Sequence, residues 1–158
     1  MPTFRAECIL KASPEALFEF HSNPANLTLV MPPTTRMVEL RAGTAAVEGD
    51  TIELRAREMG IIPMHWKCRW KRVNPPHLLV DEMIEGPFWK FEHHHRFESI
   101  DDERTKLTDE VHYEFGRGWI GWLISATFFR AYFTMMFAWR KMRMRKLFGA
   151  QTVREPDA

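Results

Sequence analysis

Three consecutive histidines, His93, His94 and His95, stand in the sequence FEHHHRFE. A histidine ring titrates near neutral pH and binds metal ions when neutral, so such a cluster could transfer protons or hold a metal. Apolar and charged residues alternate around the cluster, which is typical of a β-strand with one buried face. On such a strand His93 and His95 share a face with Phe91 and Phe97, whereas His94 lies among the charged residues. The chemistry is therefore expected from His93 and His95.

A second alternating segment, residues 105–115, supplies a carboxylate that could face these histidines. The segment SIDDERT before it is typical of a turn, so the two segments are predicted to form an antiparallel hairpin. A turn centred on Asp102 places Asp109 directly opposite His95, whereas a turn centred on Glu103 places it diagonally. Opposite Cβ atoms lie about 4.5–5.5 Å apart and diagonal ones about 7–8 Å, so both registers keep the two side chains close. A buried carboxylate needs hydrogen bonds, and His95 is its expected partner.

Three interpretations of His93, His95 and Asp109 are open, and all three residues are candidates for catalysis. They could form a satisfied polar cluster that lends hydrogen bonds to a bound molecule, which is the interpretation we favour. They could instead transfer a proton on a carbonyl substrate, with Asp109 orienting a histidine. They could also bind a metal, but His65 and His112 fall on outward-facing positions and no further ligand is placed. We therefore expect neither a metal nor another cofactor.

The composition bounds the class of protein. A chain of 158 residues with 45% hydrophobic residues and a net charge of +1 is typical of one globular domain, and its charge does not favour nucleic acid as a partner. Cys8 and Cys68 lack metal-ligand spacing and are expected to be reduced and buried. The charged residues near the N-terminus argue against a signal peptide, so we expect a cytoplasmic location. The predicted domain covers residues 1–149, followed by a flexible tail at residues 150–158.

The order of periodic segments predicts how these residues are positioned. Residues 4–10 alternate as a strand, and residues 13–29 have the caps and breaks of two short helices. Residues 34–115 alternate again between turns and predict further strands. Residues 119–149 contain no proline and predict one long helix that ends near its glycine. The prediction is an α+β fold with six or seven antiparallel strands, two short helices after strand one and a long C-terminal helix.

The long helix is apolar enough to raise the question of a membrane span. Arg130 lies near its middle, and an arginine at the centre of a bilayer costs roughly 2.5–3.5 kcal/mol on insertion scales. An antiparallel sheet with one apolar face also needs a cover, and this helix is the longest one predicted. We therefore expect the helix to pack on the sheet and not to span a membrane.

Two stretches resemble the START-like proteins of the SRPBCC superfamily, which include polyketide cyclases/dehydrases and the birch-pollen allergen. The stretches are WKCRWKRVNPPHLLVDEMIEGPFWKFEHHHRFE, residues 66–98, and TKLTDEVHYEFGRGWIG, residues 105–121. They contain Gly-Pro-aromatic, His-x-His-x-Phe and Thr-x-x-x-Asp-x-Val-x-Tyr, as the bacterial branch does. Phe91 stands where tryptophan is expected, and Met83 stands where glutamine is common. The resemblance implies a helix-grip fold, in which a curved sheet wraps around the C-terminal helix and encloses a tunnel for an apolar or aromatic molecule.

The resemblance and the strand periodicity together define the expected ligand contacts. These are Trp66, Trp70, Phe91, His93, His95, Phe97, Asp109, Tyr113, Phe129, Tyr132, Phe133 and Met136. The expected function is to bind, and so transport or sequester, a small hydrophobic, aromatic or lipid-like molecule. The alternative is a polyketide cyclase/dehydratase-like enzyme that uses a His/Asp acid–base pair. We favour the binding protein over the enzyme, and a homodimer is left open.

Overall fold

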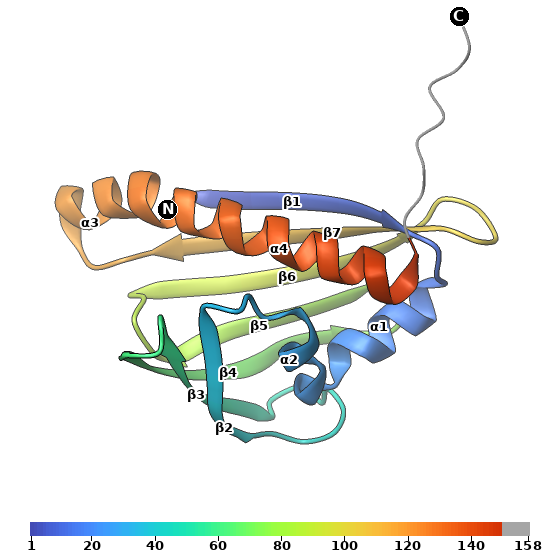
Figure 1. Ribbon diagram of the computed structural model, residues 1–158, viewed down its shortest axis with the longest axis horizontal. Helices are drawn as coiled ribbons and strands as arrows, with labels where there is room; N and C mark the ends of the chain where they lie inside the picture. Colours follow the sequence, from blue (N-terminus) through green and yellow to red (C-terminus); the bar gives the residue numbers. More distant parts are fainter. Residues whose placement is uncertain (150–158) are drawn as a thin grey trace, which may run out of the picture.

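The computed structural model describes residues 1–149, and the predicted tail at 150–158 lies outside the described residues. The alternating segments form one antiparallel sheet of seven strands in the order β1-β7-β6-β5-β4-β3-β2 (Figure 1). The strands are β1 (Thr3–Leu10), β2 (Thr35–Arg41), β3 (Thr51–Glu58), β4 (Ile62–Asn74), β5 (Leu78–Glu85), β6 (Lys90–Ser99) and β7 (Thr105–Glu114). The predicted α+β fold is confirmed, and β1 joins the sheet beside the last strand.

Two short helical segments follow β1, as predicted. They are α1 (Pro14–Ser22) and the pair formed by the 3₁₀ turn η1 (Pro24–Asn26) with α2 (Leu27–Val30). The Ser13 side chain accepts a hydrogen bond from the Ala16 amide at 3.2 Å, and Pro14 occupies the start of the helix. Both features stabilise a helix N-terminus because the first amides have no partner within the helix.

The C-terminal helix is interrupted by an irregular turn. It consists of α3 (Gly118–Ile124), a π-helical turn η2 (Ser125–Phe129) and α4 (Arg130–Phe148). Ser125 Oγ accepts a hydrogen bond from the Phe115 amide at 2.7 Å and donates one to the Gly121 carbonyl at 2.8 Å. The hydroxyl of Tyr113 donates to the Ser125 carbonyl at 3.1 Å. The end of β7 therefore binds the helix where its hydrogen bonds widen to the π pattern, which the apolar periodicity did not indicate.

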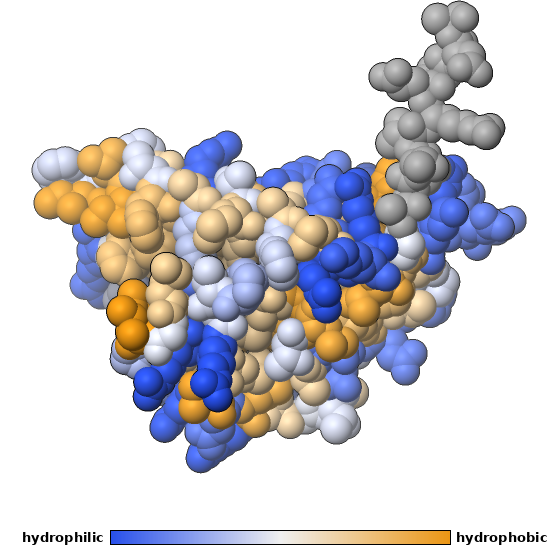
Figure 2. Space-filling model, in the orientation of Figure 1, coloured by the Kyte–Doolittle hydropathy of each residue, from blue (hydrophilic) through white to orange (hydrophobic). Residues whose placement is uncertain are grey.

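The long helix lies across one face of the sheet, on the side of β1 and β7 (Figure 1). Phe133, Phe137 and Met144 are its buried side chains on α4. Residues 118–148 are long and apolar enough to cross a membrane by composition, but in this fold they are the core helix of the helix grip. Hydrophobic side chains also gather on the surface at the α3 end (Figure 2), where Ile120 and Leu123 are exposed.

The core consists of two hydrophobic clusters separated by polar residues. One cluster contains Phe97 and Leu107, and the other contains Val111 and Phe133. On β6 the inward-facing positions between the two clusters are occupied by histidines, so the polar site interrupts the core instead of lying on its edge.

We expect Gly121→Ala to destabilise the protein, because Gly121 packs against the backbone at the end of β7. A Cβ atom there would lie 2.5 Å from the Phe115 carbonyl oxygen and 2.7 Å from the Gly116 carbonyl carbon. Such overpacking costs about 1–3 kcal/mol of unfolding free energy. Urea unfolding measures it. Gly43→Ala is the control, because its Cβ would make only ordinary contacts, with the Ala45 carbonyl oxygen at 3.5 Å and Asp50 Oδ2 at 4.0 Å. Equal stability of the two variants would contradict the packing at Gly121.

Candidate functional site

A cavity of about 230 Å³ lies between the sheet, α4 and the segment from the end of α1 to α2. Its wall is mainly apolar and takes side chains from strands β2 to β7. The polar side chains at the wall include Asp81, His93 and His95, together with His21 and Arg140. The polar cluster that separates the two hydrophobic clusters therefore reaches the cavity.

The β6–β7 hairpin has the register expected for a turn centred on Asp102. His95 lies opposite Asp109, and His93 lies opposite Val111. The alternative register, centred on Glu103, is wrong.

Asp109 holds both inward-facing histidines. Its Oδ1 atom lies 2.8 Å from His95 Nδ1 and 3.0 Å from His93 Nε2. Because a carboxylate only accepts hydrogen bonds, each of these two ring nitrogens donates a proton to it. The predicted pair of His95 and Asp109 is confirmed, and His93 is a second partner. Burial acts to raise the pKa of Asp109, but the charge of Arg140 and the two histidine hydrogen bonds outweigh it and hold that pKa well below its usual range.

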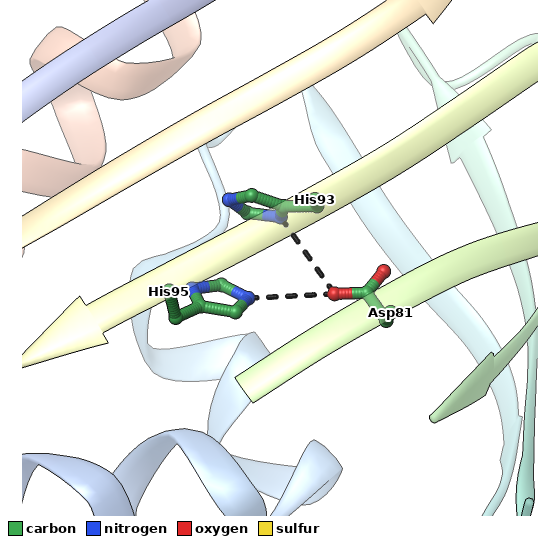
Figure 3. A group of neighbouring side chains, drawn as sticks. All are labelled: Asp81, His93 and His95. Atoms are coloured by element: carbon green, nitrogen blue, oxygen red, sulfur yellow. Dashed lines mark ion pairs between the residues drawn. The ribbon is translucent and has the colours of Figure 1, made fainter. Parts of the chain in front are cut away.

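Asp81 is a second carboxylate at this cluster, which the sequence analysis missed. Its Oδ2 atom lies 3.4 Å from His95 Nε2 and 3.9 Å from His93 Nδ1 (Figure 3). These are the ring nitrogens that do not face Asp109, so the histidines lie between two carboxylates. Strand alternation could have found Asp81, because it shares a face of β5 with the fully buried Leu79.

The two imidazoles differ in basicity although both are buried. Burial, assisted by the charge of His95, lowers the pKa of His93 to about 4. Burial also acts to lower the pKa of His95, but hydrogen bonds to Asp109 and Asp81 outweigh it and raise that pKa above its usual value. The pKa of Asp81 is lowered because the hydrogen bond with His95 and the nearby His93 outweigh the effect of its burial.

His21, at the end of α1, was also missed by the sequence analysis. Its Nδ1 atom donates to the Leu17 carbonyl at 2.7 Å, so its Nε2 atom is an acceptor. That Nε2 is buried and has no hydrogen-bond partner among residues 1–149. Burial, and then the charge of Arg140, keep the pKa of His21 well below its usual value. Its position one helical turn after the apolar Leu17 is the sequence signal that could have placed it inward.

Arg140 adds a positive charge to the cavity wall from α4. Its Nε atom is buried without a hydrogen-bond partner in the described part of the chain. The sequence analysis did not single it out, because it stands among the many lysines and arginines at the end of the helix. Helix packing turns this one toward the cavity.

Most of the predicted ligand contacts line the cavity. They are Trp66, Trp70, Phe91, His93, His95, Tyr132, Phe133 and Met136. Four others, Phe97, Asp109, Tyr113 and Phe129, do not belong to the cavity wall.

Two of these four residues pack against aromatic rings of other segments. Phe97 packs against His21 with ring centroids 5.2 Å apart. Phe129 packs against Phe88, which lies between β5 and β6, with ring centroids 4.7 Å apart. Strand and helix periodicity identify a buried face, but they do not show which part of that face is covered by another element.

The other two residues use their polar groups inside the protein. Tyr113 donates its hydroxyl to the Ser125 carbonyl, and Asp109 lies behind the histidines that it binds. Both residues therefore support the site without facing the cavity. The set of candidate metal ligands therefore becomes Asp81, His93 and His95, in place of Asp109 with the two histidines. Asp81 is the carboxylate that faces the ring nitrogens not bound to Asp109.

The sequence matches a known family model over most of its length. The model described as "Polyketide cyclase / dehydrase and lipid transport" matches residues 10–139. No curated protein matches the sequence.

Solved structures share the fold at low sequence identity. A protein of Chromobacterium violaceum has a TM-score of 0.72 and 10% identity, with 94% of this chain and 98% of that chain covered. The Zhui aromatase/cyclase of a Streptomyces species has a TM-score of 0.67 and 12% identity, with 92% and 95% covered. Norcoclaurine synthase of Thalictrum flavum has a TM-score of 0.66 and 13% identity, with 92% and 95% covered. These similarities show the helix-grip fold.

We expect Asp109→Ala to destabilise the protein by about 3–5 kcal/mol, because it removes the carboxylate that pairs two buried histidines. Thermal and urea unfolding measure the loss. Glu110→Ala is the matched control on the opposite face of β7, where the carboxylate pairs with the partly exposed His112 and the cost is about 1 kcal/mol or less. A loss for Asp109→Ala as small as for the control would show that the buried cluster contributes little to stability.

Proposed function

The chain belongs to the polyketide cyclase/dehydrase and lipid transport family, and we propose that it binds a small hydrophobic, aromatic or lipid-like molecule in the cavity between sheet and helix. The observation that carries the proposal is the apolar cavity of about 230 Å³. An apolar protein cavity of about 150 Å³ binds benzene, so this one has room for a ligand larger than a single aromatic ring. The role proposed for this binding is transport or sequestration of the ligand.

The apolar part of the wall suits a flat or flexible hydrocarbon body. Trp66 and Phe91 contribute rings with centroids 5.4 Å apart, and Phe133 continues the aromatic wall from α4. Met64 and Met136 add unbranched side chains that adapt to the shape of a ligand. Such a wall favours ligands by burial of apolar surface and not by a fixed pattern of hydrogen bonds.

The polar part of the wall favours a ligand with an oxygen-bearing group. His21 Nε2 is an acceptor and Arg140 Nε is a donor, and neither has a partner among the described residues. A buried polar atom without a hydrogen bond is costly, so a ligand that satisfies both atoms gains affinity. A hydroxyl can donate to His21, and a carbonyl, carboxylate or phenol oxygen can accept from Arg140. The ligand proposed is therefore an apolar body with a hydroxyl or carbonyl group at one end.

We expect Met136→Trp to weaken ligand binding at least tenfold, because the larger side chain fills part of the cavity. The measurement is displacement of a fluorescent apolar probe by fatty acids and by hydroxylated aromatic compounds, with native mass spectrometry of the purified protein to detect a copurified molecule. Met135→Trp is the matched control, because Met135 is the neighbouring residue and is 54% exposed.

The two tryptophan variants distinguish this cavity from binding elsewhere on the protein. Equal affinity of the two variants and the native chain would place the probe outside the cavity and contradict the proposal. Failure of every tested compound to displace the probe, with no copurified molecule, would also contradict it.

A second candidate function is acid–base catalysis on a carbonyl ligand. The observation that favours it is that His93 and His95 line the cavity while Asp109 fixes both rings from behind. One imidazole nitrogen can accept a proton from the carbon next to a carbonyl and return it to a departing hydroxyl, which leaves as water. This is the chemistry of the dehydration that follows an aldol cyclisation.

For this candidate we expect His95→Gln to abolish turnover of a poly-β-ketone substrate while affinity stays within tenfold of the native value, because the ring acts mainly in the reaction. Product formation by mass spectrometry and probe displacement measure the two quantities on one preparation. His94→Gln is the control, because His94 lies on the opposite strand face and pairs with Glu92. Unchanged turnover in His95→Gln, or loss of affinity in step with turnover, would argue against catalysis by this residue.

A further inference from the structure

Three side chains at the cavity wall direct ligand atoms at one another. The facing atoms are Asp81 Oδ2, His93 Nδ1 and His95 Nε2 (Figure 3). Each of the three residues offers one ligand atom within 4.8 Å of those of the other two. The histidines come from alternate positions of β6, and the carboxylate comes from the neighbouring strand β5, whose register pairs Asp81 with His93. Paired strands of a packed sheet therefore hold all three.

Asp109 determines which ring nitrogens are free. Its carboxylate accepts from His93 Nε2 and His95 Nδ1, so these two nitrogens carry the ring protons. When both rings are neutral, the opposite nitrogens present lone pairs toward Asp81. In metal sites a carboxylate commonly binds the outer nitrogen of a ligating histidine and fixes its orientation in this way. Asp109 does so for two histidines at once.

The spacing of the atoms fits a small transition-metal ion. Zinc binds nitrogen and oxygen ligands at about 2.0–2.2 Å, which at tetrahedral angles places two ligand atoms about 3.4 Å apart. His95 Nε2 lies 3.4 Å from Asp81 Oδ2, and His93 Nδ1 lies 3.9 Å from it. Ligand atoms of the two histidines lie within 4.8 Å of each other, so the rings need to approach for three equal tetrahedral contacts.

The local charges also favour a cation at this point. Asp81 and Asp109 are buried or nearly so, and Arg140 in the cavity wall carries one positive charge against their two negative charges. Two lone pairs and a carboxylate oxygen that face one another repel each other unless a positive charge lies between them. A second proton on a histidine could supply that charge, and so could a metal ion.

We propose that Asp81, His93 and His95 form a binding site for a divalent transition-metal ion such as Zn²⁺, with Asp109 as the residue that positions both histidines. Two histidines and one carboxylate leave coordination positions open, as in catalytic metal sites. All three ligands line the cavity, so an open position faces the bound molecule and accepts a hydroxyl, carbonyl or carboxylate oxygen from it. The inference goes beyond the proposed function and does not depend on it, because metal binding needs no organic ligand.

The test is titration of the chelator-treated full chain with Zn²⁺ by calorimetry and with Co²⁺ by visible absorption. We expect one site per chain and the d–d absorption of Co²⁺ in a low-symmetry nitrogen and oxygen environment. Asp109→Asn should weaken binding by about 10–100-fold, as loss of an outer partner does. Asp81→Asn, which removes a ligand with little change of shape, should weaken it further.

A separate control addresses metal binding at the surface. His94 and His112 lie on the outer face of the sheet with ring centroids 5.3 Å apart, each beside a glutamate, and could bind zinc adventitiously. The double variant His94→Ala/His112→Ala should keep the affinity and the Co²⁺ spectrum of the native chain. Circular dichroism of each variant tests whether it is folded. If Asp81→Asn does not fold, His93→Phe provides a second variant that lacks a ligand.

Two results would overturn the proposal. One is binding that Asp81→Asn and His93→Phe leave unchanged while the outer-face double variant abolishes it. The other is no binding by the native chain at micromolar Zn²⁺. In that case a second proton on a histidine, and not a metal ion, would supply the positive charge between the two carboxylates. Neither result bears on probe displacement from the cavity, so failure of the metal site and failure of the proposed ligand-binding function are distinguishable.

Discussion

The buried carboxylate of Asp109 is the interaction on which the candidate site depends. A charge enclosed between two hydrophobic clusters is tolerated only when hydrogen bonds and opposite charges compensate it. Here two imidazole donors and the positive charge of Arg140 provide that compensation. The same bonds fix the tautomers and orientation of His93 and His95, so the groups that face the cavity are determined by the need to satisfy the carboxylate behind them.

The cavity itself follows from a mismatch between the sheet and its covering helix. Strands are spaced about 4.7–4.9 Å apart, whereas a helix with its side chains is about 10–12 Å wide, so one helix covers only two or three strands of seven. The α4 helix packs beside β1, and α1 packs on β5 and β6 (Figure 1). The space between these covers is lined by the apolar face of the sheet, and the polar cluster lies on its wall.

The sequence alone was sufficient for the fold and for part of the site. Strand alternation assigned His93 and His95 to the buried face and His94 to the outer face, and the SIDDERT turn placed Asp109 beside His95. These inferences succeeded because a hairpin is local: its register is set by a few turn residues, and alternation is fixed by the pleat of the strand. The same rule could have placed Asp81 inward, but it gives no reason to associate Asp81 with a hairpin that begins nine residues later.

Composition and periodicity thus determined which faces are buried, while the tertiary structure decided which buried residues meet. His21 from α1, Asp81 from β5 and Arg140 from α4 reach one cavity wall, although they lie up to about 120 positions apart in the chain. Conversely, Phe97, Tyr113 and Phe129 have the periodicity of wall residues, yet they contact His21, the Ser125 carbonyl and Phe88. The physical reason is that periodicity reports the direction of a side chain relative to its own strand or helix, whereas the partner in that direction depends on how distant elements pack.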